Sequence, residues 1–190
     1  MPKYGHDQTK RDAEALYPSV PINDCIAIIV EKLKNAPELP KRTKLSPEEI
    51  GNLISLCLSS TDFIFNNRHH TTKDSGPIGL SLMVTVSQMW MIHTMEGAIR
   101  KAEEDDSPIP DNIFVYMDDC LCTITSRVYM RPGLRSNSSS TDPAESFNQC
   151  LNSVHPRVCF TREAEEDGKI AFLDVLAHRQ ENGELTTQIY

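Results

Sequence analysis

Two adjacent aspartates, Asp118 and Asp119, are the residues of this 190-residue chain whose type and setting point most directly to chemistry. They lie between two apolar, β-prone runs in the segment Asn112–Thr125, and neither run contains Gly or Pro. This pattern predicts a tight hairpin of two buried strands with both carboxylates at its tip. Neighbouring carboxylates repel each other and burial makes each charge costlier, so the two aspartates need a cation or a basic side chain nearby.

Apolar periodicity predicts four helices, at about residues 24–35, 47–58, 80–102 and 144–153. Asn23 or Asp24 can cap the first of them, and Ser46 with Glu49 has the spacing of a capping box at the start of the second. The prolines within residues 12–21 force an extended, turning path, and we expect no helix in that segment.

Strand patterns predict a hairpin and three further strands, at about residues 63–72, 158–161, 170–178 and 185–190. The turn signals Asp167-Gly168 and Asn182-Gly183 indicate that the C-terminal strands form a meander. Met1–Arg11 is polar and has neither a strand nor a helix period, and Arg127–Pro143 is predicted to be a surface loop. The resulting fold class is α+β.

Composition narrows the possible functions. A net charge of −8 argues against a self-sufficient nucleic-acid binder, which usually has a basic surface, but it is compatible with an acidic site that attracts metal ions. No apolar run approaches the roughly 20 residues that span a bilayer, and the N-terminus lacks a signal-peptide core. We therefore expect an intracellular protein, in the cytoplasm or nucleus, with no membrane partner. None of the six cysteines has zinc-site spacing, which indicates reduced, buried thiols.

The order of these segments resembles motifs A to E of a reverse-transcriptase palm, most closely that of Penelope-like and related non-LTR-type retroelements. Asp12–Pro21 resembles the first motif, and Phe63–Asn67 with the loop Gly76–Gly79 resembles the second. Tyr-Met-Asp-Asp at residues 116–119 is the signature of the metal-binding hairpin of reverse transcriptases. Phe172–Leu176 resembles the segment beyond that hairpin, so the likeness covers nearly all of the chain from Asp12 to Tyr190.

The resemblance implies a partial reverse-transcriptase palm at residues 12–190, preceded by a polar segment at residues 1–11. Its fold would be an antiparallel sheet that carries the Tyr-Met-Asp-Asp hairpin and is backed by helices. The implied activity is that of an RNA-directed DNA polymerase of a retrotransposon, a nucleotidyltransferase that uses two Mg²⁺ ions or Mn²⁺ in their place. The implied partners are an RNA template, a DNA primer and deoxynucleoside triphosphates. Fingers and thumb segments are expected to be missing, and the isolated fragment is expected to be inactive.

Carried over by position, the resemblance assigns the metal-binding catalytic carboxylates to Asp12, Asp118 and Asp119. The residues implied to lie against the nucleotide are Tyr17, Gly79, Tyr116 and Met117. Tyr17 would pack under the sugar of the incoming nucleotide, where a 2′-hydroxyl would clash with it. Gly79 would let the chain pass close to the nucleotide or template.

Two other interpretations remain open on the sequence. The chain can be a non-catalytic palm remnant that acts as a structural or interaction module. Alternatively, the acidic hairpin can be a structural cation site in an unrelated α+β domain.

Overall fold

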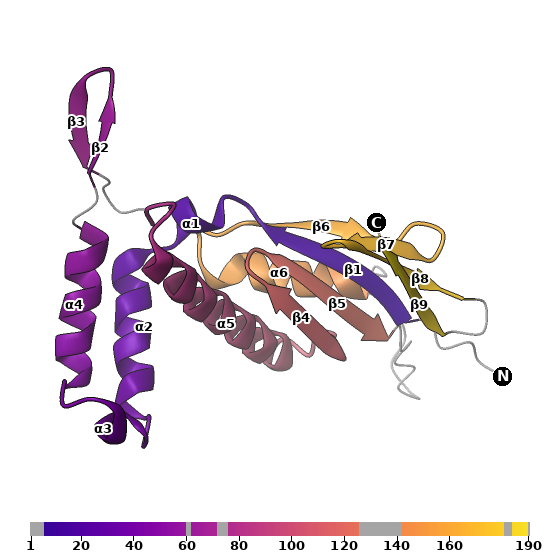
Figure 1. Cartoon of the computed structure of the whole chain (residues 1–190). Coiled ribbons are helices and arrows are strands. Elements are labelled where there is room, and N and C mark those ends of the chain that lie inside the picture. Colours follow the sequence, from indigo (N-terminus) through magenta and orange to yellow (C-terminus); the bar gives the residue numbers. More distant parts are fainter. Residues whose placement is uncertain (1–5, 60–61, 72–75, 126–141, 181–183, 190) are drawn as a thin grey trace. The chain divides into compact units, whose positions relative to one another are not determined.

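The computed structural model describes residues 6–59, 62–71, 76–125, 142–180 and 184–189. The chain divides into two compact units, coloured along the sequence in Figure 1. The first unit contains residues 1–14 and 94–190, and the second contains residues 15–93. Helix α5 (Ser81–Glu104) begins in the second unit and ends in the first.

The first unit is built on a four-stranded antiparallel sheet with the order β4-β5-β1-β6. Its strands are β4 (Asn112–Tyr116), β5 (Asp119–Thr125), β1 (His6–Ala13) and β6 (Phe160–Ala164). The N-terminal strand β1 is therefore central, with Arg11 opposite Cys120 of β5 on one side and Arg162 of β6 on the other.

One face of this sheet forms the core of the unit. The residues of β1 and β5 that point to this face are buried; they are Thr9, Arg11, Ala13, Cys120, Cys122 and Ile124. Helix α6 (Pro143–Val154) lies along this face in Figure 1 and buries Phe147 and Leu151 completely. The side chain of Asp142 caps α6 by accepting a hydrogen bond from Ala144 N at 3.0 Å.

A separate three-stranded sheet holds β7 (Lys169–Phe172), β8 (Val175–Arg179) and β9 (Leu185–Ile189). It is a meander, but not the one expected: the strand predicted at 158–161 is β6 of the other sheet, where it pairs with β1, and the single strand predicted at 170–178 is wrong. Leu173 has a φ of 54°, so the chain turns there and the run becomes two paired strands. The Asn182-Gly183 turn and most of the predicted loop Arg127–Pro143 lie outside the described residues.

The second unit contains α1 (Leu16–Ser19), α2 (Ile22–Lys34), α3 (Leu39–Arg42), α4 (Pro47–Ser59) and the hairpin β2 (Asp62–Phe65) and β3 (Arg68–Thr71). Helices α2 and α4 lie side by side in Figure 1, and a Cβ added at Gly51 would come within 2.6 Å of Val30 Cγ2. The capping box is confirmed, because Ser46 N donates to Glu49 Oε2 at 2.7 Å and Glu49 N donates to Ser46 Oγ at 3.2 Å.

Three expectations for the N-terminal residues are wrong. Residues 6–11 form most of strand β1, where no strand was predicted. A short helix, α1, includes Pro18; it is a single turn, in which the missing proline N–H would have had no partner. Helix α2 begins at Ile22 with Pro21 as its N-cap, so Asn23 and Asp24 lie in its first turn instead of capping it. Within the described residues, no helix is both long enough and apolar enough to cross a membrane.

The cysteine prediction holds in part. All six cysteines are free thiols, and Cys120 and Cys122 share the buried face of β5 as their spacing predicts. Cys57 and Cys159 are exposed, however.

Candidate active site

The acidic hairpin has the predicted form. Tyr116 of β4 is opposite Asp119 of β5, and Met117 and Asp118 form the two-residue turn between them. Met117 has a φ of 56°, a left-handed conformation that two-residue hairpin turns require. The expectation that both strands are buried is wrong for β4. It is the edge strand of the sheet, and the side chains of Phe114 and Tyr116 are 56% and 58% exposed.

The strand register brings the third aspartate to this hairpin. Asp12 is opposite Asp119, and the backbone N–H of the next residue, Ala13, donates to Asp118 O at 3.0 Å. Asp12 and Asp118 are exposed, while Asp119 is half-buried. The three aspartates of the predicted site therefore occupy adjoining ends of two paired strands, although Asp12 is distant from the other two in sequence.

The charges of these side chains act on one another. Partial loss of hydration at the carboxyl, and then the charges of Asp118 and Asp119, raise the pKa of Asp12 above its ordinary value, while Lys10 lowers it. Lys10 Nζ lies 3.2 Å from Asp119 Oδ1. The basic neighbour that the sequence required for two adjacent aspartates is thus Lys10, two residues before Asp12 on the same strand.

The aspartates are of the chemical type that a divalent ion takes as ligands. Mg²⁺ prefers oxygen ligands and is commonly bound by one or two carboxylates. Among the described residues, however, no group of three or more His, Cys, Asp or Glu side chains is arranged to hold a metal ion. Closing such a site would require the carboxylates to turn toward one point, beside the ammonium of Lys10.

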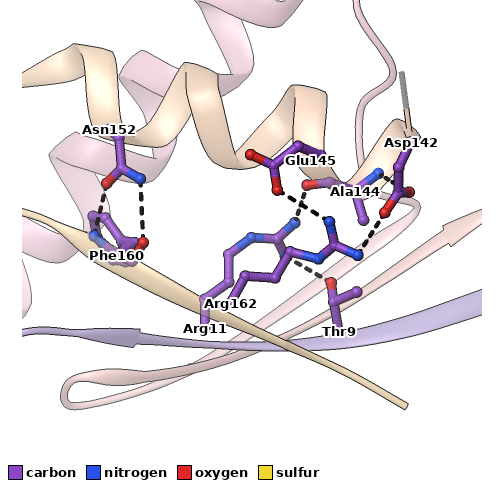
Figure 2. Close-up of polar contacts among 8 residues, drawn as sticks. All are labelled: Thr9, Arg11, Asp142, Ala144, Glu145, Asn152, Phe160 and Arg162. Atoms are coloured by element: carbon purple, nitrogen blue, oxygen red, sulfur yellow. Dashed lines mark hydrogen bonds and ion pairs between the residues drawn. The ribbon is translucent and has the colours of Figure 1, made fainter. Parts of the chain in front are cut away.

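A buried polar layer on the other face of the sheet holds β1 in place. Figure 2 shows Arg11 and Arg162 reaching from neighbouring strands toward the first turn of α6. Arg11 is completely buried, donates to Thr9 Oγ1 and to Ala144 O at 2.9 Å each, and lies 5.2 Å from the centre of the Phe147 ring. These contacts explain why a polar sequence can form the central strand.

Arg162 forms ion pairs with acidic side chains at the N-terminus of α6. Its guanidinium lies 2.5 Å from Asp142 Oδ2 and 3.1 Å from Glu145 Oε2. Further along α6, Asn152 accepts from Phe160 N at 2.7 Å and donates to Phe160 O at 3.1 Å. Sequence reasoning missed this support, because the helix dipole alone favours acidic residues at the start of a helix and they need no basic partner there.

The two remaining nucleotide residues lie in the second unit. Tyr17 is half-buried on α1, and its carbonyl accepts from Gly76 N at 3.0 Å. Gly79 has a φ of 98°, a backbone conformation that favours glycine, but a Cβ added there would meet no atom within 4 Å. Glycine is therefore favoured at this position by its backbone conformation and not by close packing. Gly76 is the crowded glycine of this loop, because an added Cβ would lie 2.6 Å from Tyr17 O.

Comparison with known proteins identifies a solved structure with a similar fold. No protein-family model and no curated protein matches the chain. The chain is similar to an apo telomerase from Candida tropicalis truncated from its C-terminal domain, with a TM-score of 0.61 and 14% identity. The match covers 96% of this chain and 35% of the telomerase chain, so the protein spans about a third of that structure. The chain accordingly shares its α+β fold with part of that telomerase structure.

The raised pKa of Asp12 predicts a pH-dependent stability. The folded protein holds a proton on Asp12 more tightly than the unfolded chain does, so this carboxyl destabilises the fold as pH rises through the interval between the two pKa values. In the presence of a chelator, Asp12→Asn should therefore melt at a higher temperature than wild type at neutral pH. The difference should shrink below about pH 4, the ordinary range of the group.

Melting curves at a series of pH values measure this effect. Asp174→Asn, at an exposed position in the β7–β8 turn, is the control for loss of one negative charge. A difference between Asp12→Asn and wild type that does not vary with pH would contradict the interaction of the three aspartates.

Proposed function

We propose that this chain is the palm of a reverse transcriptase, which binds a divalent ion and a deoxynucleoside triphosphate at Asp12, Asp118 and Asp119. The observation that supports it best is the register of β1 against β5, which joins an aspartate from the N-terminal strand to the acidic hairpin. The fold shared with part of a telomerase is the context in which that arrangement is expected to perform nucleotidyl transfer.

Each residue has a role in the proposed site. A bound divalent ion supplies charge stabilisation to the attacking and leaving oxygens of nucleotidyl transfer. Asp12 and Asp118 would hold such an ion, with Asp119 as the third ligand. Tyr116 and Met117 flank the carboxylates on the hairpin, and the ring of Tyr17 would exclude a 2′-hydroxyl from the sugar position.

The finer assignment is to a retroelement of the Penelope-like or a related type. The order of motifs supports it: Asp12–Pro21, Phe63–Asn67 with Gly76–Gly79, then the Tyr-Met-Asp-Asp hairpin. The substrates that follow from this assignment are an RNA template, a DNA primer and deoxynucleoside triphosphates with Mg²⁺ or Mn²⁺.

A non-catalytic palm is the second candidate, and one observation favours it. Asp119 is engaged by Lys10 at 3.2 Å, and the described side chains do not form a ready metal cluster. A module of this kind would keep the sheet and the acidic hairpin without binding nucleotide. The third interpretation, an unrelated α+β domain, is disfavoured by the fold likeness to telomerase.

Nucleotide binding separates the two candidates. A net charge of −8 repels a phosphate backbone, so we expect no detectable primer extension by these 190 residues, and binding is the better measurement. Titration with dTTP in Mg²⁺ should show saturable binding that Asp118→Asn weakens by about tenfold or more, the effect of about 1.4 kcal/mol. Asp174→Asn should leave the affinity unchanged.

Sugar discrimination tests Tyr17 separately. Wild type should bind dTTP more tightly than UTP, and Tyr17→Ala should remove most of that preference because the bulk under the sugar is gone. Tyr17→Phe, which keeps the ring, should retain it. Absence of Mg²⁺-dependent dTTP binding in wild type would favour the non-catalytic module.

A further inference from the structure

The ammonium of Lys10 lies where it would compete with a metal ion for Asp119. Lys10 precedes Asp12 by two residues on β1, and side chains two apart on a strand lie on the same face. Its Nζ is 3.2 Å from Asp119 Oδ1, and both side chains are about a quarter exposed, at 26% and 24%. The Lys10 ammonium therefore already places a positive charge beside Asp119.

The other basic side chains of this part of the sheet are directed elsewhere. Arg11 is adjacent to both Lys10 and Asp12, but its guanidinium contacts Thr9 and Ala144 on the α6 face. Arg162 is held by Asp142 and Glu145 on that same face. Within the described residues, Lys10 is the basic side chain that forms an ion pair with one of the three aspartates.

We infer that Lys10 is a built-in counter-cation of the carboxylate site, which competes with a divalent ion for Asp119 and so weakens metal binding. This inference rests on the proposed function, because it assumes that Asp12 and Asp118 bind the ion. A metal ion that took Oδ1 of Asp119 would have to displace the Lys10 ammonium from that oxygen or stand close to it. Either outcome costs electrostatic energy, so Lys10 opposes metal binding at Asp119.

The expected effect of removing Lys10 is a tighter metal site. Repulsion between a monovalent and a divalent charge about 6 Å apart in water corresponds to about a tenfold change in affinity. Lys10→Met keeps the aliphatic stem and removes the charge, so it should strengthen Mn²⁺ binding by about that factor. Lys10→Arg keeps the charge and should stay close to wild type.

Mn²⁺ titration of the full chain, with free Mn²⁺ followed by electron paramagnetic resonance, measures the affinity without any need for turnover. Lys41→Met is the matched control, because it removes the same charge from a lysine that pairs with Glu38 at 2.9 Å. In a Lys10→Met background, Asp119→Asn should remove most of the gain. An unchanged affinity in Lys10→Met, or an equal gain in Lys41→Met, would overturn the inference.

A measurement on wild type covers the case in which Lys10 variants fail to fold. Mn²⁺ should speed acetylation of Lys10, followed by mass spectrometry, because metal binding releases its amine from Asp119; Lys41 should not respond. An acetylation rate of Lys10 that is insensitive to Mn²⁺ would contradict the inference. If Asp118→Asn leaves Mn²⁺ binding intact, the proposed function fails; if only the Lys10 effects are missing, the Lys10 inference fails alone.

Discussion

Mg²⁺ and Mn²⁺ are expected to raise the melting temperature of the wild-type chain, and the double change Asp118→Asn with Asp119→Asn is expected to abolish that rise. Partial desolvation, and then repulsion by Asp118 and Asp119, raise the pKa of Asp12. A divalent ion relieves that repulsion, so it is expected to bind the folded state in preference to the unfolded chain. At a concentration about 100 times the dissociation constant, such binding contributes about 2.7 kcal/mol. For a chain of this size, that corresponds to a shift of about 5 °C or more.

The control for this prediction is the exposed acidic run at residues 103–106, at the end of α5 and just beyond it. Glu103→Gln with Glu104→Gln removes the same number of charges and should leave the metal-induced rise intact. Differential scanning fluorimetry with and without metal makes the comparison. An equal rise in the Asp118/Asp119 double variant would mean that the stabilising ion binds elsewhere.

Arg11→Ala is expected to have the largest effect on stability, a loss of about 3 kcal/mol, because it leaves a large cavity between β1 and α6. Arg11→Met should cost far less, within about 1 kcal/mol. It fills much of the same volume, and it removes a charge whose burial is itself costly, since no carboxylate pairs with Arg11 among the described contacts.

Denaturant unfolding of the two variants tests this difference, with Arg100→Ala at an exposed position of α5 as the control. The control should lie within about 0.5 kcal/mol of wild type. A loss in Arg11→Met as large as in Arg11→Ala would show that the hydrogen bonds to Thr9 and Ala144, and not the packing on Phe147, hold the strand.

The features that could be predicted from sequence are those set by near neighbours in the chain. The capping box needs only Ser46 and Glu49, and the acidic hairpin needs only the two runs beside Asp118. The helices at 47–58, 80–102 and 144–153 follow from apolar periodicity and lie within a few residues of α4, α5 and α6.

Strand β1 could not be predicted, because its burial depends on distant partners. Arg11 has no local reason to be inside a protein, and Phe147 and Ala144 of α6 provide the environment that makes it possible. The Lys10–Asp119 ion pair depends in the same way on the register between β1 and β5. The turn at Leu173 also escaped prediction, since an apolar residue with a positive φ breaks a run that otherwise favours one strand.

Anomalous scattering from Mn²⁺ in crystals of the wild-type chain would show directly whether Asp12 and Asp118 share a divalent ion. We expect a peak about 2 Å from carboxylate oxygens of both Asp12 and Asp118, the distance expected for a small hard cation. The ion pair between Lys10 and Asp119 should be broken when Asp119 joins the ligands. Mn²⁺ bound only at other acidic groups, such as those of residues 103–106, with Asp12 and Asp118 unliganded, would contradict this expectation.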